Sequence, residues 1–324
     1  MILLPHRHPR PQRPGRAVLA CLAFLSGTAA AEVMPGGPVP VAGATLVDAT
    51  PSVVPAELLT LRLVRADGRV RDVLALLARP EGKREVPAVV LMPDGLGLDQ
   101  RLSEVAERLG AEGWATLQID LDPVSTDGHN PSGPFPLAAE ADANDVVGDL
   151  AMVLQALSED PAINPNRIAV VGLGTGGRAG LLAGSEAEMS RELDTFGPRF
   201  AAHVAFYPGC RALLAEGFAA PVPWSNAPVA VFHAGKDEQN AASACDTLGD
   251  ALAVRRRPPA MWHAYPSATY AWDLGSATGN TAIKLANVGT TPVPVAPDHR
   301  LAEDAIGRLI SFLRPVLGEP SKPR

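Results

Sequence analysis

The apolar and polar positions along the chain predict a sheet of buried strands alternating with amphipathic helices. Residues 58–64 and 70–78 alternate apolar and polar side chains on either side of Asp67-Gly68, a pattern typical of a β-hairpin. Further along, short uninterrupted apolar runs alternate with longer amphipathic stretches, which indicates a parallel sheet covered by helices on both faces. The predicted strands are residues 88–92, 115–119, 168–171, 203–206 and 229–232, and the predicted helices are residues 101–112, 141–157, 241–255 and 301–316.

The first 31 residues are typical of a secretory signal peptide. Four arginines between Arg7 and Arg16 precede an apolar run at residues 17–24, and the small residues 29–31 follow. This order of basic region, apolar core and small-residue cleavage site is that of an export signal. The apolar run is too short to span a bilayer as a helix. We therefore expect export to the periplasm or the cell exterior, cleavage near Ala31 and no stable membrane insertion.

After cleavage, a Pro/Gly-rich leader is expected at residues 32–55 and a single α/β domain at residues 56–318. Cleavage leaves 24 basic and 35 acidic residues, a net charge of −11. This charge argues against nucleic acid or an anionic membrane surface as a partner. Apart from His6 and His8 within the predicted signal peptide, the sequence contains no H-x-H, H-x-x-x-H or C-x-x-C pair, so no metal site is predicted in the mature chain.

The segment most informative about chemistry is IAVVGLGTGG, which predicts a strand, a tight turn and a helix. Gly172, Gly174 and Gly177 satisfy the dinucleotide-binding pattern G-x-G-x-x-G. That fold also needs an acid at the end of the next strand, where this chain has residues 206–208, FYP. Alternatively, Gly172 and Gly176 are the outer glycines of a nucleophile elbow with Gly174 at its centre. An ordinary glycine-rich turn also fits the local sequence.

Four further segments resemble the dienelactone hydrolases, in the same order along the chain. VVLMPDGLG at residues 89–97 is similar to the strand and loop that supply an oxyanion donor, and AFYPGC at 205–210 is similar to a Y-P-G-C segment. VAVFHAGKD at 229–237 resembles the turn that carries the family's acid, and YPSATYAWD at 265–273 resembles the loop that carries its histidine. The resemblance covers roughly residues 58–317. It implies an α/β-hydrolase fold with a doubly wound, mostly parallel sheet and no cofactor.

The resemblance assigns only one intact member of a catalytic triad. Asp237 matches the acid, whereas Gly174 stands at the nucleophile position, usually cysteine or serine, and Tyr270 stands at the histidine position. Loss of either the nucleophile or its base costs about a millionfold in turnover in a serine protease. The resemblance therefore implies a protein without the family's catalysis.

The oxyanion hole requires no particular side chain. The resemblance places its donors at the backbone N–H groups of Thr175 and of Gly95 or Leu96. Asp94 stands near an acid that some relatives place beside the nucleophile.

Cys210 and Cys245 are the cysteines left after cleavage. Two cysteines in an oxidising compartment predict one structural disulfide between them.

The leading hypothesis is thus a pseudoenzyme that binds an unknown small molecule or protein at the former active-site cleft. A second hypothesis is an active ester or lactone hydrolase with a relocated nucleophile or base. Its candidates are Cys210 and His233, together with Asp298-His299 if residues 275–297 fold over the cleft. A dinucleotide-dependent enzyme using Gly172, Gly174 and Gly177 is the third.

Overall fold

The computed structural model describes residues 55–80, 85–95, 97–121, 143–218, 223–237, 242–255, 260–275, 283–286 and 292–318. These residues belong to one compact unit of the chain. The predicted signal peptide, nearly all of the predicted leader and Leu96 lie outside the described residues. Among the described residues, no helix is both long enough and apolar enough to cross a membrane.

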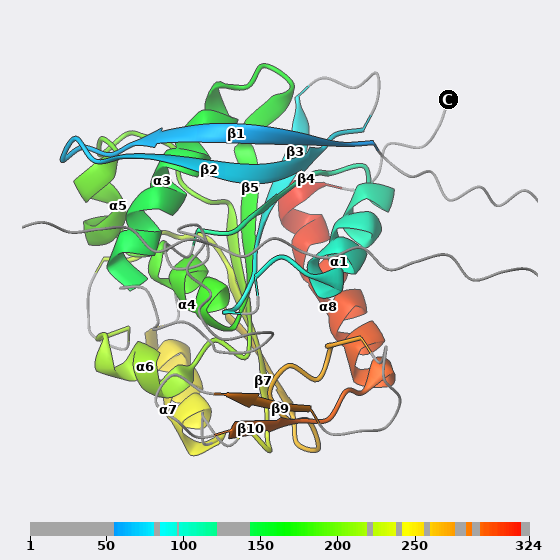
Figure 1. Ribbon diagram of the computed structural model, residues 1–324. Helices are drawn as coiled ribbons and strands as arrows, with labels where there is room; N and C mark the ends of the chain where they lie inside the picture. Colours follow the sequence, from blue (N-terminus) through cyan, green and yellow to red (C-terminus); the bar gives the residue numbers. More distant parts are fainter. Residues whose placement is uncertain are drawn as a thin grey trace, which may run out of the picture. The chain divides into compact units, whose positions relative to one another are not determined.

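An eight-stranded sheet forms the centre of the unit, with the strand order β1-β2-β4-β3-β5-β6-β7-β8 (Figure 1). The first two strands are antiparallel to each other, β2 is antiparallel to β4, and all remaining neighbours are parallel. The strands are β1 (Ala56–Val64), β2 (Val70–Ala78), β3 (Val86–Met92), β4 (Ala115–Ile119), β5 (Ile163–Leu173), β6 (Ala202–Phe206), β7 (Val229–Ala234) and β8 (Ala260–Tyr265).

This topology confirms the predicted α/β-hydrolase fold. It also tests the interpretation of the glycine turn as a dinucleotide-binding motif. A dinucleotide-binding sheet of the doubly wound type has the strand order 3-2-1-4-5-6 and begins with the strand that carries the glycines. Here the glycines follow β5, and an antiparallel hairpin precedes the parallel strands. The dinucleotide hypothesis is therefore not supported.

Helices cover both faces of the sheet because the parallel strands carry apolar side chains on both of their faces. In β5, Ile168 and Val170 pack into one core and Ala169 and Val171 pack into the other. Helices α1 and α8 lie together on the second core, and α3, α4 and α7 lie on the first (Figure 1). The helices are α1 (Gln100–Ala111), α3 (Ala143–Glu159), α4 (Gly174–Leu182), α5 (Glu186–Glu192), α6 (Cys210–Ala215), α7 (Ala242–Arg255) and α8 (His299–Leu317).

The first hairpin has the predicted strands and turn. Arg65 N–H donates to the carbonyl of Arg69, and Gly68, with φ +86°, closes the turn by donating to the carbonyl of Arg65. A second pair of strands, β9 (Ile283–Ala286) and β10 (Pro292–Val295), was not predicted. Each strand has only four residues, and Pro292 and Pro294 interrupt the apolar pattern from which a strand would be predicted. A two-stranded ribbon tolerates proline because both strands are edge strands, and the outward-facing N–H groups of an edge strand need no ladder partner.

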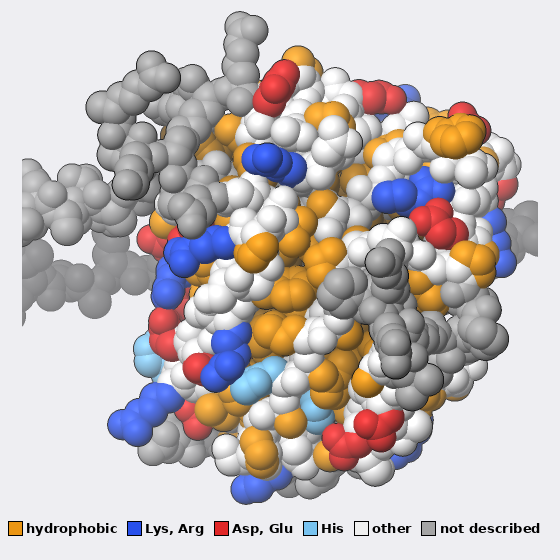
Figure 2. Space-filling model, turned by 180° about the vertical axis from the view of Figure 1, so that it is seen from behind, with side chains coloured by type: hydrophobic (Ala, Val, Ile, Leu, Met, Phe, Trp, Pro, Cys, Tyr) orange, Lys and Arg blue, Asp and Glu red, His pale blue; other side chains and the backbone are white. Residues whose placement is uncertain are grey.

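Charged side chains are mixed over the face seen from behind. On this face, Lys and Arg side chains are interspersed with Asp and Glu side chains, and the described residues form no extended basic patch (Figure 2).

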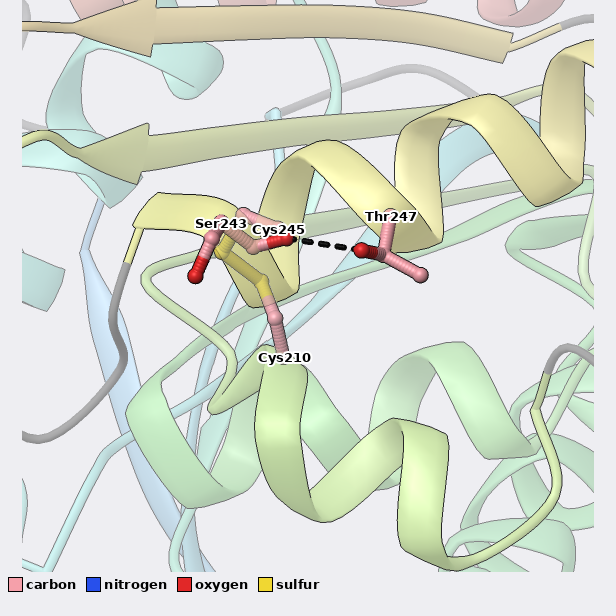
Figure 3. Close-up of a disulfide and its surroundings, with 4 residues drawn as sticks. All are labelled: Cys210, Ser243, Cys245 and Thr247. Carbon is pink, nitrogen blue, oxygen red and sulfur yellow. Dashed lines mark hydrogen bonds between the residues drawn. A yellow bond between two sulfur atoms is a disulfide. The ribbon is translucent and has the colours of Figure 1, made fainter.

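The predicted disulfide joins Cys210, at the start of α6, to Cys245 in the first turns of α7 (Figure 3). The two Cα atoms are 5.0 Å apart, and both cysteines are buried. Beside the bond, the hydroxyl of Thr247 donates to the carbonyl of Ser243 at 2.8 Å within α7. The crosslink thus fixes the segment after β6 to the helix after β7.

Reduction of this disulfide should lower the free energy of unfolding. A loop with a sequence separation of 35 residues corresponds to about 4 kcal/mol in the chain-entropy description. Urea titrations with and without reductant measure the difference. The variant Cys210→Ser/Cys245→Ser should match the reduced protein and be insensitive to reductant. An oxidised protein that unfolds at the same urea concentration as the reduced one would contradict the expectation.

Candidate functional site

The glycine turn has the backbone geometry of a nucleophile elbow. Strand β5 ends at Leu173, and α4 begins at Gly174, whose φ is +46°. The centre of an elbow is held in this left-handed region, which is costly for every residue with a Cβ and cheap for glycine. Gly174 therefore has the conformation that the elbow hypothesis predicts.

The two outer glycines are required by close backbone approach. A Cβ at Gly172 would overlap the carbonyl of Gly176, and a Cβ at Gly176 would overlap the carbonyl oxygen of Pro93. Gly176 N–H also donates to that Pro93 oxygen at 3.1 Å. The elbow is thus fastened to the loop after β3, the segment in which an oxyanion donor was expected.

Tyr270 fills the space above Gly174. A Cβ at position 174 would lie 2.5 Å from the Tyr270 hydroxyl oxygen and 2.7 Å from the Asp94 Cβ. Both distances are shorter than any normal contact of a Cβ atom. Tyr270 is 6% exposed and Asp94 is 1% exposed, so neither side chain stands loosely at the surface. The phenol at the histidine position therefore lies where the side chain of a nucleophile would project.

Asp94 is the acceptor at the centre of a buried network. Tyr270 Oη donates to Asp94 Oδ2 at 3.0 Å. Arg101 donates to the same carboxylate in the bidentate manner, from Nη1 to Oδ2 at 2.9 Å and from Nη2 to Oδ1 at 2.8 Å. Charge-assisted pairs of this geometry are stronger than neutral hydrogen bonds and fix the orientation of both groups. The Arg101 and Asp94 side chains are 1% and 0% exposed.

Helix α1 places Arg101 in this position. Asp99 caps the helix, since its Oδ1 accepts from the Arg101 backbone N–H at 2.9 Å. The Asp99 carboxylate also accepts from Arg101 Nε at 2.9 Å and from Nη2 at 2.6 Å. One guanidinium therefore bridges two carboxylates, one at the helix N-terminus and one beside the elbow.

Tyr207 and Asp273 complete the group. Arg101 Nη1 donates to Tyr207 Oη at 3.1 Å, and Tyr207 Oη donates to Asp273 Oδ1 at 2.7 Å. The rings of Tyr207 and Tyr270 meet edge to face with centroids 4.9 Å apart. We call the following six residues the elbow network: Asp94, Asp99, Arg101, Tyr207, Tyr270 and Asp273.

The backbone around the elbow network is strained. Tyr207 has φ +41° and Ala271 has φ +48°, both in the left-handed region that non-glycine residues rarely adopt. Such conformations cost on the order of 1–3 kcal/mol each and persist where the surroundings enforce them. Here the enforcing contacts are the hydrogen bonds of the Tyr207 hydroxyl and the burial of Ala271.

Burial sets the protonation states within the elbow network. It raises the pKa of Tyr270 well above its usual value, and the charge of Asp94 raises it further. Burial likewise raises the pKa of Tyr207, with a second contribution from Asp273. Both phenols are therefore neutral donors. Burial also raises the pKa of Asp273 to about 6, against the opposing effect of Arg101.

Asp237, the expected triad acid, lies in the turn after β7 close to this network. It is 6% exposed, and its charge contributes to the raised pKa of Tyr270. The turn is tied to the loop that carries Tyr270: Gly235 N–H donates to the carbonyl of Tyr265, and Lys236 N–H donates to that of Ala268. The segments expected to carry a nucleophile, an acid and a histidine thus meet at one place.

Of the residues expected to supply oxyanion donors, Thr175 and Gly95 are described, and both lie beside the elbow. Thr175 is half-buried in the first turn of α4, and Gly95 follows Asp94 in a turn closed by Gly97 N–H donating to the Asp94 carbonyl. Leu96 lies outside the described residues. Assignment of these groups to an oxyanion hole stays a prediction.

The residues considered for a relocated nucleophile or base have other roles. Cys210 is held in the disulfide. His233 is 2% exposed, burial lowers its pKa, and its ring lies 5.8 Å from that of Trp262. Asp298 caps α8, accepting from Arg300 and Leu301 N–H. Within the described part of the chain, no group of three or more His, Cys, Asp or Glu residues could hold a metal ion.

Sequence reasoning missed Arg101, Tyr207 and Asp273. The signal for Arg101 was present, because it falls on the same helical stripe as Leu102, Val105 and other buried residues of α1. A charged residue at such a position needs a buried partner. Tyr207 and Asp273 lie in segments that resemble the family, but the resemblance assigns no role to either residue.

The chain is similar to known proteins in sequence. The sequence model described as "Dienelactone hydrolase family" matches residues 73–317. A "Probable 2-oxo-3-(5-oxofuran-2-ylidene)propanoate lactonase" of a Bradyrhizobium species is 30% identical over 112 residues. That match covers 34% of this chain and 45% of the relative, so it spans less than half of the relative's length.

Solved structures share the fold at low sequence identity. A dienelactone hydrolase-like promiscuous phosphotriesterase from metagenomic libraries is 20% identical, with a TM-score of 0.55 over 81% of this chain and 99% of the other. Thermogutta terrifontis esterase 2 phosphorylated by paraoxon is 14% identical, with a TM-score of 0.57 over 83% of this chain and 96% of the other. These likenesses show the α/β-hydrolase fold.

Adding a single methyl group at the elbow should be unusually destabilising. Gly174→Ala combines backbone strain of about 1 kcal/mol with overpacking against Tyr270 and Asp94 worth a further 1–3 kcal/mol, approximately. Gly68→Ala is a matched control: φ is +86°, and no described residue outside its immediate neighbours lies within 4 Å of a Cβ built there. Urea unfolding measures both. In a Tyr270→Phe background the excess cost of Gly174→Ala should shrink. Equal costs at the two glycines would contradict the packing described here.

The raised pKa of Asp273 predicts a specific pH dependence of stability. The folded protein holds this proton up to about pH 6, whereas the unfolded chain releases it near the ordinary pKa of about 4. Stability contributed by this group is therefore lost as pH rises from about 4 to 7. Relative to wild type, Asp273→Asn should gain roughly 3 kcal/mol across this window. Urea titrations at several pH values test this, with the exposed Asp250→Asn as control. A difference in unfolding free energy between Asp273→Asn and wild type that stays the same at every pH would contradict the expectation.

Proposed function

The chain belongs to the dienelactone hydrolase family, and we propose that it is a non-catalytic member, an exported binding protein. The observation that carries the proposal is the position of the Tyr270 hydroxyl, 2.5 Å from where a side chain at residue 174 would begin. The site lacks a nucleophile, and it also lacks the space in which the nucleophile would stand.

Acyl transfer by this family's route requires a nucleophile and a base that act as a unit. Gly174 offers no side chain, and the Tyr270 phenol is a poor base because its pKa is raised and its proton is donated to Asp94. Position 270 holds no histidine for Asp237 to orient, because its residue is Tyr270. Backbone donors at the elbow could still stabilise an oxyanion, which alone accounts for roughly a thousandfold over water.

A different form of the second hypothesis, in which Tyr270 rather than Cys210 is the relocated nucleophile, rests on one geometric fact. The Tyr270 oxygen lies near the place of a nucleophile and hydrogen-bonds a carboxylate. Tyrosine forms covalent intermediates in some enzymes. Asp94 is a weak base for this purpose, because the bidentate bond to Arg101 stabilises its ionised form. The Tyr270 hydroxyl is buried and keeps its proton. Both properties favour the non-catalytic assignment.

Export is supported by the buried disulfide, since such bonds persist in oxidising compartments. Binding at the elbow would take place on its outer surface, because the elbow network fills the interior with the protein's own side chains. The exposed part of the loop after β3 includes Leu98, which is 39% exposed. A protein partner suits such a surface better than a small molecule, which needs an enclosed pocket.

The purified protein should hydrolyse short p-nitrophenyl esters and simple lactones no faster than the buffer background. It should not react with a fluorophosphonate probe, because the site offers no activated nucleophile. Stoichiometric labelling, with the adduct mapped by mass spectrometry to any residue, would contradict the proposal. An adduct on Tyr270 would establish the second hypothesis instead.

Rebuilding the triad provides the positive control. Tyr270→His with Gly174→Ser restores a nucleophile and a base near Asp237, and it removes the phenol that blocks position 174. Weak esterase activity should appear in the double variant and in neither single variant. Adding Asp237→Asn should abolish the restored activity. Circular dichroism and urea unfolding show whether each variant is folded, so that inactivity from misfolding is recognised.

A further inference from the structure

Strand β1 forms one edge of the main sheet, and no strand of the described residues lies beyond it. Its ladder with β2 runs without a bulge from Ala56 to Val64, so the edge is long and regular. Proteins usually guard such an edge with proline, lysine, a bulge or a covering segment. Residues 58–64 contain neither proline nor lysine, and their one charged side chain, Arg62, is paired with Asp72 of β2. Among the described residues, this edge is therefore open to another strand.

The hydrogen bonds of the hairpin determine which backbone groups of β1 face outward. Arg65 N–H donates to the Arg69 carbonyl at 2.9 Å, which makes these two residues a hydrogen-bonded pair. Such pairs alternate along an antiparallel ladder, so the odd-numbered residues of β1 bond to β2. The even-numbered residues direct their N–H and C=O groups away from the hairpin. They are Leu58, Thr60, Arg62 and Val64.

The side chains of β1 follow the same order in both directions. Residues 58–64 have the sequence LLTLRLV, in which apolar and polar residues are placed symmetrically about Leu61. When two copies of β1 run antiparallel about Leu61, each residue faces one of its own kind on the same side of the sheet. This self-complementarity identifies a second copy as the strand that fits the edge. The facing pairs are Leu58 with Val64, Leu59 with Leu63 and Thr60 with Arg62.

The backbone and the charges select this register. Pairing through the outward groups requires even-numbered residues to face even-numbered residues, as they do about Leu61. Other registers therefore differ by steps of two residues along one copy. A step in one direction sets Arg62 opposite Leu58, and a step in the other sets Arg62 opposite Arg62 of the partner. Like charges directly opposite each other are destabilising, so the register about Leu61 is favoured.

We propose that two copies of this chain associate through β1, paired antiparallel about a two-fold axis at Leu61, so that their sheets become continuous. Main-chain hydrogen bonds along an open edge supply affinity, and the side chains supply specificity. Leu58 and Val64, 65% and 53% exposed, then cover each other on the outer face. Leu59 and Leu61, which are only partly buried in the monomer, are covered on the inner face. The proposal is independent of the loss of catalysis.

Sedimentation velocity of the full chain, with its disulfide intact, tests the proposal from roughly 1 µM to 1 mM, the range of weak to moderate affinity. A dimer should form within this range. Thr60→Pro should raise its dissociation constant at least about tenfold, because proline removes an outward N–H and its ring blocks the approaching strand. Pairing with β2 should persist, since Thr60 N–H takes no part in it. The matched control Thr60→Val keeps the N–H and should dimerise as wild type does. Urea unfolding shows whether each variant is folded.

A single cysteine tests the register. Across a two-fold axis, the Cα atoms of a facing pair without mutual hydrogen bonds are about 4.5 Å apart, within the reach of a disulfide. Leu61→Cys should therefore crosslink two copies under mild oxidation, as measured by non-reducing electrophoresis. Leu59→Cys is the matched control, half-buried on the same face of β1.

The counterpart of residue 59 in the partner lies four residues along the strand, roughly 13 Å away, so Leu59→Cys should not crosslink. Three results would overturn the proposal. They are a protein that stays monomeric throughout the concentration range, a dimer unaffected by Thr60→Pro, and crosslinking of Leu61→Cys that is no faster than that of Leu59→Cys.

Discussion

The bidentate ion pair between Arg101 and Asp94 organises the end of the sheet at which the elbow lies. Asp94 follows β3, Arg101 begins α1, Tyr207 follows β6 and Tyr270 belongs to the loop after β8, and all meet at this pair. A buried arginine is costly unless every donor is satisfied. Here two carboxylates and a phenol accept its hydrogen bonds. The loops that an α/β-hydrolase devotes to chemistry are thereby held together as a structural polar core.

The charge of the elbow network explains why tyrosines belong to it. Three carboxyl groups, those of Asp94, Asp99 and Asp273, surround a single guanidinium. Phenol groups add donors without adding charge, so Tyr207 and Tyr270 satisfy the remaining carboxylate oxygens. A histidine at position 270 would titrate in this environment. Tyrosine stays neutral over the whole physiological range because burial raises its pKa.

Most of the fold was accessible from the sequence because the hydrophobic pattern fixes it locally. The hairpin around Gly68, the buried strands and the long helices follow from alternation and amphipathicity. The glycine spacing alone fitted an elbow, a dinucleotide-binding turn and an ordinary turn, and the resemblance of the neighbouring segments favoured the elbow. Packing between distant segments was not accessible. That Tyr270 would fill the space above Gly174, and that Tyr207 would reach Arg101, depends on contacts across residue separations of 96 and 106 that no local pattern encodes. The short ribbon of β9 and β10 was missed because proline obscured it.

The contact between Tyr270 and Gly174 also bears on the evolutionary history open to this chain. A serine introduced at position 174 meets the phenol, so that change alone brings instability without activity. A histidine introduced at position 270 brings a base with nothing to activate, and it removes a donor from Asp94. Neither step is favoured by selection for hydrolysis, although the two together would be. On the proposed non-catalytic function, a return to hydrolysis by the route of this family would therefore require at least two substitutions together.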